Sequence, residues 1–351
     1  MTGLGPGRIP RRSREAVVDV GMTIGGKRTH GAGKLAVENP ARAEEFAHAP
    51  AASAQDVHHA VAAAAAAFPD WSALSFAERA QLLRDCRTLL HRHIDEFSRL
   101  LTLEQGKPLA DARAEVALAA DWFGHTAALS LPSENLVDEP GALLSMEHVP
   151  YGAVAAVAPS NFPLILAITK VAPALLAGNT VVLKPSEVTP LASLRMTELL
   201  GEVLPAGVFN SICGGPDIGA ALTEHPAIGL ISFTGSVPVG RAIARSAAGG
   251  FKHVVLELGG NDACLVLPGA DVTALAPRIF AAAMVNNGQF CAAIKRIYIP
   301  APKAEQLTSA LADLAATVRL GDGLLTGTEY GPLVSRSQLD RAAALVAEAR
   351  A

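Results

Sequence analysis

Hydrophobic positions recur at helical spacing through the first half of the chain. Ser53 and Asp56 can cap an alanine-rich helix, and Ser75 followed by Glu78 has the spacing of a capping box. The pattern therefore predicts a largely helical first half. Its helices are expected over 53–67, 75–90 and 109–128.

From Tyr151 onward, short β-branched runs alternate with helical windows. This alternation predicts an α/β fold with a parallel sheet and helical crossovers. Ligands of such sheets bind beyond the carboxyl ends of the strands, so residues that follow each strand are the candidates for a site. Strands are predicted at 153–157, 180–183, 209–213, 229–233 and 253–258, and helices at 164–177, 191–203, 218–224, 237–247 and 337–351.

The longest stretch without a charged residue is 151–169, nominally long enough to span a bilayer. Its centre holds Pro159, Ser160, Asn161 and Pro163, which make a membrane helix a poor interpretation. A buried strand, an irregular loop and the start of a helix fit better, and no membrane partner is expected.

The composition is that of a globular protein, with half of the 351 residues hydrophobic, which suits about two domains. Charged residues make up 18% and the net charge is −4, which argues against a nucleic-acid partner because such partners select basic surfaces. The four cysteines are scattered and form no CxxC pair. Neither disulfides nor a metal site are expected, and a cytoplasmic, reducing location fits.

One strand-to-helix connection has the composition of a phosphate site. The strand predicted to end at Phe233 leads through Thr234, Gly235 and Ser236 into a helix that contains Gly240. Glycine lets the backbone approach a phosphate, and a helix amino terminus favours negative charge. An ordinary strand-to-helix turn is the equally open alternative.

Three further residues offer catalytic chemistry. Glu257 ends an apolar strand beside two glycines, where a semi-buried position would suit it to general-base work, although an ion-paired or capping role is the ordinary alternative. Asn161 lies in a loop stiffened by two prolines; it either presents a fixed amide to an oxyanion or bonds its own backbone. Cys291 follows a polar, glycine-containing turn and is either a reactive thiol or a buried structural cysteine.

In order and separation, these segments resemble the NAD(P)-dependent aldehyde dehydrogenases. The resemblance extends from about Thr23 to the last residue, and it implies a Rossmann-like parallel-sheet cofactor domain plus an incomplete α/β catalytic domain. Its blocks are Asn39-Pro40, Glu104–Pro108, Pro159–Pro163, Ala172–Glu187, Phe233–Gly240, Leu256–Gly260 and Gly288–Cys291 with Arg296 beyond.

The resemblance also implies a role for each matching residue. Cys291 would be the nucleophile, Glu257 the base, and Asn161 the side-chain donor of an oxyanion hole whose second donor is the Cys291 backbone N–H. An aldehyde would give a thiohemiacetal on Cys291 and then, after hydride transfer, a thioester. Glu257 would activate the water that releases the carboxylic acid.

The implied cofactor is NAD, with NADP as the other choice, because Glu187 at the adenosine ribose would repel a 2′-phosphate. The implied aldehyde pocket is mostly apolar, which favours an uncharged aldehyde as the small-molecule partner. The cofactor-binding residues are Pro159, Ser160, Lys184, Glu187, Gly235, Ser236, Gly240 and Leu258. The pocket residues are Phe162, Leu166, Thr169 and Phe290.

In the family, the catalytic domain continues beyond the position of Ala351, so we expect a carboxy-terminally truncated member. Homo-oligomers are usual in the family, whereas a missing partner strand argues against one here. The expected regions are 1–22, a disordered tail or misplaced start; 23–130 and 149–258, the NAD-binding domain; 131–148, a strand pair forming an oligomerisation arm; and 259–351, a partial catalytic domain.

Two alternatives to aldehyde oxidation remain. The first is a non-catalytic remnant that at most binds dinucleotide through its sheet. The second, a cysteine-dependent hydrolase or acyl-transferase, is disfavoured because His253 is the only histidine near the matched catalytic blocks.

Overall fold

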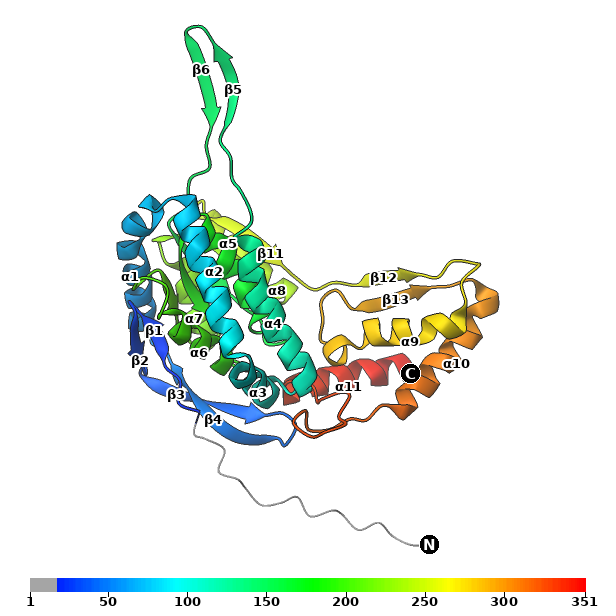
Figure 1. Ribbon diagram of the computed structural model, residues 1–351. Coiled ribbons are helices and arrows are strands. Elements are labelled where there is room, and N and C mark those ends of the chain that lie inside the picture. Colours follow the sequence, from blue (N-terminus) through cyan, green and yellow to red (C-terminus); the bar gives the residue numbers. More distant parts are fainter. Residues whose placement is uncertain (1–17) are drawn as a thin grey trace.

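The computed structural model describes residues 18–351, and a seven-stranded sheet forms its centre (Figure 1). Five strands run parallel in the order β11-β10-β7-β8-β9, and β1-β2 extends the sheet antiparallel at the β9 edge. The predicted α/β class with a parallel sheet is confirmed. The strands are β7 (Ala153–Val157), β8 (Thr180–Lys184), β9 (Phe209–Ser211), β10 (Ile228–Thr234), β11 (His253–Glu257), β1 (Met22–Ile24) and β2 (Lys27–Thr29).

The centre of the sheet is buried on both faces. Every residue of β8 is buried, and only Val157 of β7 is partly exposed. Because β7 pairs with β8 on one side and with β10 on the other, the winding of the chain reverses between β7 and β10. In sheets of this kind, the carboxyl edge at such a reversal is where ligands bind.

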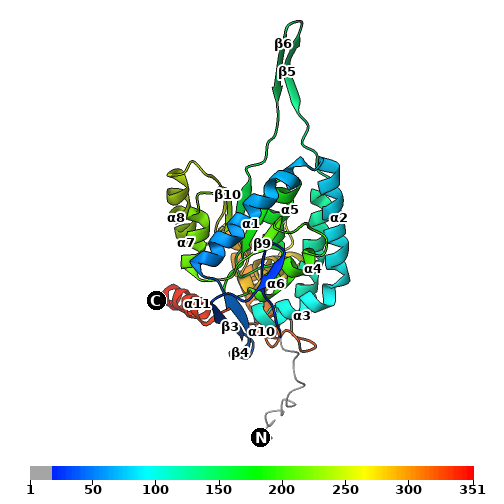
Figure 2. The same cartoon turned by 90° about the vertical axis from the view of Figure 1, so that its left-hand side faces the viewer.

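Helices cover both faces of the sheet (Figure 2). One face carries α1 (Ala54–Ala73), α7 (Pro216–Glu224) and α8 (Val237–Ala248). The other face carries α5 (Ile165–Leu176) and α6 (Leu191–Leu200), with α2 (Phe76–Arg92), α3 (Ile94–Gln105) and α4 (Leu109–Thr126) packed outside them.

Two of the predicted helix starts are confirmed by their capping geometry. The Ser53 hydroxyl accepts the Asp56 backbone N–H at 3.2 Å, while the Asp56 carboxylate accepts the Ser53 N–H at 2.8 Å. Ser75 and Glu78 form the same reciprocal pair at 3.2 and 2.8 Å. Each box satisfies donors that an α-helix leaves free at its first turn.

The expectation of a largely helical first half is wrong for residues 22–51. This segment forms β1 and β2 at the sheet edge and the hairpin of β3 (Gly33–Asn39) and β4 (Glu44–Ala51). These strands bury few side chains, among them Val37 and Ala49, each 1% exposed. A short edge strand with so few apolar positions carries little alternation, so the hydrophobic pattern does not distinguish it from a loop.

Most of the predicted amino-terminal tail lies outside the described residues. At its end, however, Val20 is 4% exposed and Met22 is fully buried. The packed part of the chain therefore begins before the expected boundary at Thr23.

Residues 131–148 form the expected strand pair, β5 (Glu134–Glu139) and β6 (Ala142–Met146). The hairpin projects away from the rest of the molecule (Figure 1). Its side chains are exposed along almost its whole length, including Leu136, Leu143 and Leu144.

A second, smaller unit follows the sheet. Its core consists of Val266, Val272, Ala276, Ile279 and Leu307. Its strands β12 (Asp262–Leu265) and β13 (Ile294–Tyr298) pair in parallel, and its helices are α9 (Val272–Ala283) and α10 (Ala301–Thr317). The last helix, α11 (Arg336–Arg350), buries no residue.

Within residues 18–351, no single helix is long and apolar enough to cross a membrane. Only α1 and α2 taken together meet that length and composition, and they are bent by 119° at their junction.

Glu104 at the end of α3 is a fully buried carboxyl group. Its two oxygens accept the backbone N–H groups of Leu191 at 2.7 Å and Ala192 at 3.0 Å, in the first turn of α6. Burial raises the pKa of Glu104 to about 8, against the lowering effect of these two hydrogen bonds. One buried side chain thus joins α3 to the helix that follows β8.

We predict that Glu104 makes the stability of the chain depend on pH. Because its folded pKa of about 8 exceeds the ordinary 4.5, its contribution is complete below pH 4.5 and is lost as the pH rises through 8. In that window the free energy of unfolding should fall by at most about 1.4 kcal/mol per pH unit. Urea unfolding at several pH values should show this slope reduced in Glu104→Gln and kept in the exposed-site control Glu202→Gln. An equal slope in both variants would contradict the assignment.

Candidate active site

Several predicted site segments meet at the carboxyl edge of the sheet. The loop after β7 is joined to β8 by the hydrogen bond from Ala158 N to Lys184 O, 3.0 Å long. The turn after β10 is joined to β11 by the bond from Gly235 N to Glu257 O, also 3.0 Å long. The fold therefore brings these separate sequence blocks to one end of the molecule.

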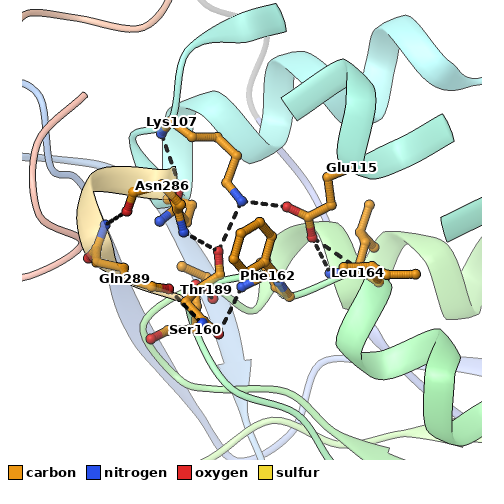
Figure 3. Close-up of polar contacts among 12 residues, drawn as sticks. Lys107, Glu115, Ser160, Phe162, Leu164, Thr189, Asn286 and Gln289 are labelled. Atoms are coloured by element: carbon orange, nitrogen blue, oxygen red, sulfur yellow. Dashed lines mark hydrogen bonds and ion pairs between the residues drawn. The ribbon is translucent and has the colours of Figure 1, made fainter. Parts of the chain in front are cut away.

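Asn161 connects the loop after β7 to the loop that carries Cys291. Its amide nitrogen donates to the backbone carbonyl of Gln289 at 2.7 Å, and its amide oxygen accepts the Phe162 N–H at 3.0 Å. The side chain therefore bonds its own backbone, as a turn asparagine does, and also reaches a carbonyl two residues before the cysteine. Figure 3 shows Phe162 and Gln289, the residues whose backbone groups these two hydrogen bonds reach.

The loop before Cys291 has an unusual backbone. Asn286, Asn287 and Gly288, in the 3₁₀ turn Val285–Gly288, all have positive φ values of 50°, 60° and 74°. Asparagine and glycine tolerate this left-handed region best, yet each non-glycine residue there carries a cost of about 1–3 kcal/mol. The loop must therefore be held by its surroundings.

Side-chain amides of the loop provide those contacts. Asn286 donates to Asn161 O at 2.9 Å, and Asn287 donates to Pro332 O at 2.9 Å. Gln289 donates to Asn286 O at 3.0 Å and accepts the Val334 N–H at 2.9 Å. These bonds join the segment directly before Cys291 to the loop after β7 and to residues 332–334.

Glu257 is more exposed than the sequence argument assumed. It is the last residue of β11, which is an edge strand of the sheet, and its side chain is exposed rather than semi-buried. The strand nevertheless leads to the nucleophile loop. A Cβ atom placed on Gly260 would lie 2.5 Å from the Cys291 carbonyl oxygen, so the glycine turn after β11 directly contacts the backbone of Cys291.

Lys170 is a site residue that the sequence argument missed. It is a buried lysine of α5, and its amino group donates to the hydroxyl of Thr234 at the end of β10. Burial lowers the pKa of Lys170 to about 8, while nearby Glu257 acts in the opposite direction. The available signal was a single lysine inside a helix that is otherwise uncharged.

Two of the predicted ribose-binding residues lie together after β8. The amino group of buried Lys184 is 3.6 Å from the Glu187 carboxylate and donates to Pro185 O at 3.2 Å. Glu187 is partly exposed. The pair therefore offers a donor and an acceptor at the edge of the sheet, which suits recognition of sugar hydroxyl groups.

The predicted phosphate-binding residues surround the start of α8. Ser236 is the exposed N-cap, and its side chain makes no capping hydrogen bond. Such a start favours an anion, because backbone N–H groups remain available. The Gly235 N–H donates to the Glu257 carbonyl and is therefore not free for a ligand. A Cβ on Gly240 would lie 2.6 Å from the Leu258 side chain, so a glycine is needed there for helix α8 to pack against Leu258.

The remaining predicted residues line the region between α5 and the cysteine loop. The rings of Phe162 and Phe290 meet edge to face, with centroids 5.4 Å apart. Thr169 and Leu166 lie one turn apart on α5, and the Thr169 hydroxyl donates to Leu166 O at 3.1 Å. In the loop before them, Pro159 and Ser160 are partly buried, and Ser160 O accepts the Thr189 hydroxyl at 3.3 Å.

A cavity of about 590 Å³ lies on the α4 side of Phe162. Its lining includes Phe162, Ile165, Val285 and Tyr330, but not Cys291. It also omits the other residues of the predicted aldehyde pocket, namely Leu166, Thr169 and Phe290. Phe162 is therefore the one residue that belongs both to the lining of this cavity and to the predicted aldehyde pocket.

The four cysteines have different environments. Cys86 and Cys213 are buried, and burial raises the pKa of each thiol to about 12. Cys264 and Cys291 are partly exposed, and all four are free thiols. Within residues 18–351, no group of three or more His, Cys, Asp or Glu side chains is arranged to hold a metal ion.

The strand order β9-β8-β7-β10-β11 is that of the dinucleotide-binding α/β folds, and here a second unit with a partly exposed cysteine adjoins the binding edge. The protein is thus of the class that combines a dinucleotide-type sheet with a thiol-bearing unit.

The sequence profile of the aldehyde dehydrogenase family matches residues 28–351, and the chain belongs to this family. The 3,6-anhydro-alpha-L-galactose dehydrogenase of Streptomyces coelicolor is 38% identical over 320 residues, covering 90% of this chain and 65% of that relative. The NADP-dependent succinate-semialdehyde dehydrogenase of Escherichia coli is 35% identical over 318 residues, covering 89% of this chain and 66% of that relative.

Solved structures agree on the fold. A cysteine-to-alanine variant of aldehyde dehydrogenase C from Pseudomonas syringae, complexed with NAD+ and octanal, matches with a TM-score of 0.86 at 37% identity. That match covers 92% of this chain and 67% of the other. The chain spans 61–67% of the length of six curated relatives that it matches.

The contact between Gly260 and Cys291 gives a test of the site geometry. Gly260→Ala would place a methyl group against the Cys291 carbonyl and force the backbone apart, which should destabilise the chain by about 1–3 kcal/mol. Gly259→Ala is the matched control, because a Cβ there meets no atom within 4 Å. Thermal unfolding should therefore show a clearly lower Tm for Gly260→Ala alone. Equal Tm values for the two variants would argue against the contact.

Proposed function

We propose that this chain oxidises an aldehyde to a carboxylic acid with NAD, using Cys291 as the nucleophile. The observation that carries the proposal is the 2.7 Å hydrogen bond from the Asn161 amide to Gln289 O. It holds the predicted oxyanion donor against the loop of the predicted nucleophile. Membership of the aldehyde dehydrogenase family supports the same reaction class.

The first step would use residues of both loops. The Cys291 thiolate attacks the aldehyde carbon and gives a thiohemiacetal whose oxygen carries the negative charge. Donors fixed before the reaction stabilise such an oxyanion without further reorganisation. We assign this role to the Asn161 amide together with the Cys291 backbone N–H.

A dinucleotide would be held at the carboxyl edge of the sheet. The uncapped start of α8 at Ser236 fits a pyrophosphate, and the pair of Lys184 and Glu187 fits the adenosine ribose. Pro159, Ser160 and Leu258 border this edge. A nicotinamide cofactor held by these residues would supply a hydride acceptor, and loss of hydride from the thiohemiacetal carbon would leave a thioester on Cys291.

Hydrolysis of the thioester requires a base and a water. We assign the base to Glu257, whose exposed carboxylate at the end of β11 is open to solvent. Lys170 lies close enough to this carboxylate for Glu257 to act against the burial that lowers the Lys170 pKa. The carboxylic acid then leaves, and Cys291 is regenerated.

The substrate we propose is an uncharged aldehyde. Phe162 and Phe290 form an apolar aromatic pair beside the cysteine, and Leu166 extends this surface along α5. Apolar walls stabilise a hydrocarbon chain and penalise a charged one. The octanal in the structure of the Pseudomonas syringae relative is a ligand of this type.

We further propose that the β5–β6 arm mediates oligomerisation, because it exposes Leu136, Leu143 and Leu144 to solvent. We also propose the domain assignment in which 23–130 and 149–258 bind the cofactor and 259–351 belong to the catalytic domain. A reducing cytoplasm suits a chain that needs Cys291 as a free thiol.

The decisive measurement is NADH formation on mixing the purified chain with NAD and a panel of aldehydes. Cys291→Ala should abolish NADH formation because it removes the sulfur on which the proposed thiohemiacetal and thioester form. Cys264→Ala is the matched control, since this cysteine is also partly exposed, and it should keep the rate. NADH formation by Cys291→Ala would refute the mechanism, and a silent chain that still binds NAD would favour the dinucleotide-binding alternative.

Cofactor choice gives a separate prediction. The Glu187 carboxylate should repel a 2′-phosphate, so kcat/KM should be at least about tenfold higher with NAD than with NADP. Glu187→Gln removes the negative charge. The ratio of kcat/KM with NAD to kcat/KM with NADP should then move towards one, mainly because KM for NADP falls. Equal efficiency with both cofactors in the unchanged chain would contradict the role of Glu187.

A further inference from the structure

A buried ion pair lies behind the candidate active site. The Lys107 amino group is 2.5 Å from the Glu115 carboxylate, and both side chains are only 1% exposed. Removing two charges from water costs free energy that can offset their attraction, so a gain in stability does not by itself explain why this pair is buried. Its other contacts indicate what it does.

Both members of the pair bind the segment that contains Asn161 (Figure 3). Lys107 donates to Asn161 O at 2.9 Å, and its amino group lies 4.0 Å from the centre of the Phe162 ring. Glu115 accepts the backbone N–H of Leu164 at 3.0 Å and that of Ile165 at 3.4 Å. The pair thus fixes the residues from Asn161 to the first turn of α5.

The same carbonyl group joins this segment to the nucleophile loop. Asn161 O accepts the Asn286 side chain at 2.9 Å in addition to Lys107, and the Asn161 side chain donates to Gln289 O. The Asn161 carbonyl oxygen therefore connects Lys107 to the segment before Cys291, because it accepts hydrogen bonds from both Lys107 and Asn286.

The turn that carries Lys107 supports the loop from another direction. Gly106 has φ of 93°, and a Cβ there would lie 2.8 Å from Pro332. Pro332 O accepts the Asn287 side chain at 2.9 Å. The turn consequently contacts the segment that anchors the left-handed residues before Cys291.

We propose that Lys107 and Glu115 are positioning residues that set the Asn161 amide against the Cys291 loop. The inference rests on the proposed function, because it assigns these residues to the same oxyanion site. The ammonium group suits this task, since it donates to the carboxylate and to the Asn161 carbonyl at once. An apolar pair of equal volume would fill the space without directing the loop.

The test separates positioning from folding. Single removal of Lys107 leaves a buried carboxylate unpaired, so the informative variant is Lys107→Met combined with Glu115→Gln, which removes both charges. We expect this variant to fold and to keep KM for NAD within about twofold. Its kcat should fall about 10- to 100-fold, because a displaced oxyanion donor costs that much.

A double-mutant cycle shows whether the pair acts through Asn161. In an Asn161→Ala background, the two charge-removing substitutions should lower kcat by no more than about twofold further. The matched control is Arg87→Met with Asp121→Asn, which removes an exposed ion pair between α2 and α4 and should leave kcat unchanged. Full kcat in the charge-free variant, or independent multiplicative losses in the cycle, would overturn the proposal. If that variant does not fold, Glu115→Asp, which keeps both charges but shortens the acceptor, should show a smaller loss in the same direction.

Amide hydrogen exchange tests the positioning without turnover. Peptides covering 161–165 and 286–291 should exchange faster in the charge-free variant than in the unchanged chain, while peptides from β7 and β8 should not change. Unchanged exchange in both segments would overturn the proposal even if the chain is active. Faster exchange in a chain that never forms NADH would support the positioning role and refute the proposed function alone.

Discussion

The arrangement of this molecule depends on the reversal of winding at β7. Because β8 and β10 pair with opposite sides of β7, the loops after β7 and β10 leave the sheet in different directions and open a space between them. Asn161 enters from one loop, and Ser236 lies on the other. The chemistry therefore gathers at one edge for a topological reason, whereas the second unit has only to bring Cys291 against that edge.

Holding Cys291 there requires polar contacts in a region with little apolar core. The hydrophobic core cluster of the second unit contains five buried residues, far fewer than the cluster of the sheet domain. Its junction with the sheet domain is made by the amide side chains of Asn286 and Asn161, and by the close approach of Gly260 to Cys291. Hydrogen bonds are directional, so they fix the position of a loop more sharply than apolar packing of the same area. That directionality suits a thiol that must meet two donors and a cofactor.

Local signals in the sequence, such as Ser75 with Glu78, predicted the parallel sheet and both capping boxes, whereas the strand pair at 131–148 was expected only from the family resemblance. The sequence failed for β1 to β4, whose pairing partners are distant or whose buried positions are few. At the candidate site, the sequence indicated which residue types are present but not how far each side chain is buried. The exposure of Glu257 follows from the edge position of β11, and the burial of Lys170 follows from packing against Thr234. Neither depends on neighbours in sequence.

Because two of the four cysteines are buried and two are partly exposed, the number of thiols that react with a reagent differs between the folded and the unfolded chain. Burial raises the pKa of Cys86 and Cys213 to about 12 and keeps both sulfur atoms away from solvent, so neither is a reactive thiolate near neutral pH. Alkylating reagents will therefore count at most Cys264 and Cys291 until the chain unfolds, when four groups react. The stoichiometry of labelling thus reports the fraction of folded protein in a preparation, and a Cys264-free version would carry a probe at a single position without loss of its core cysteines.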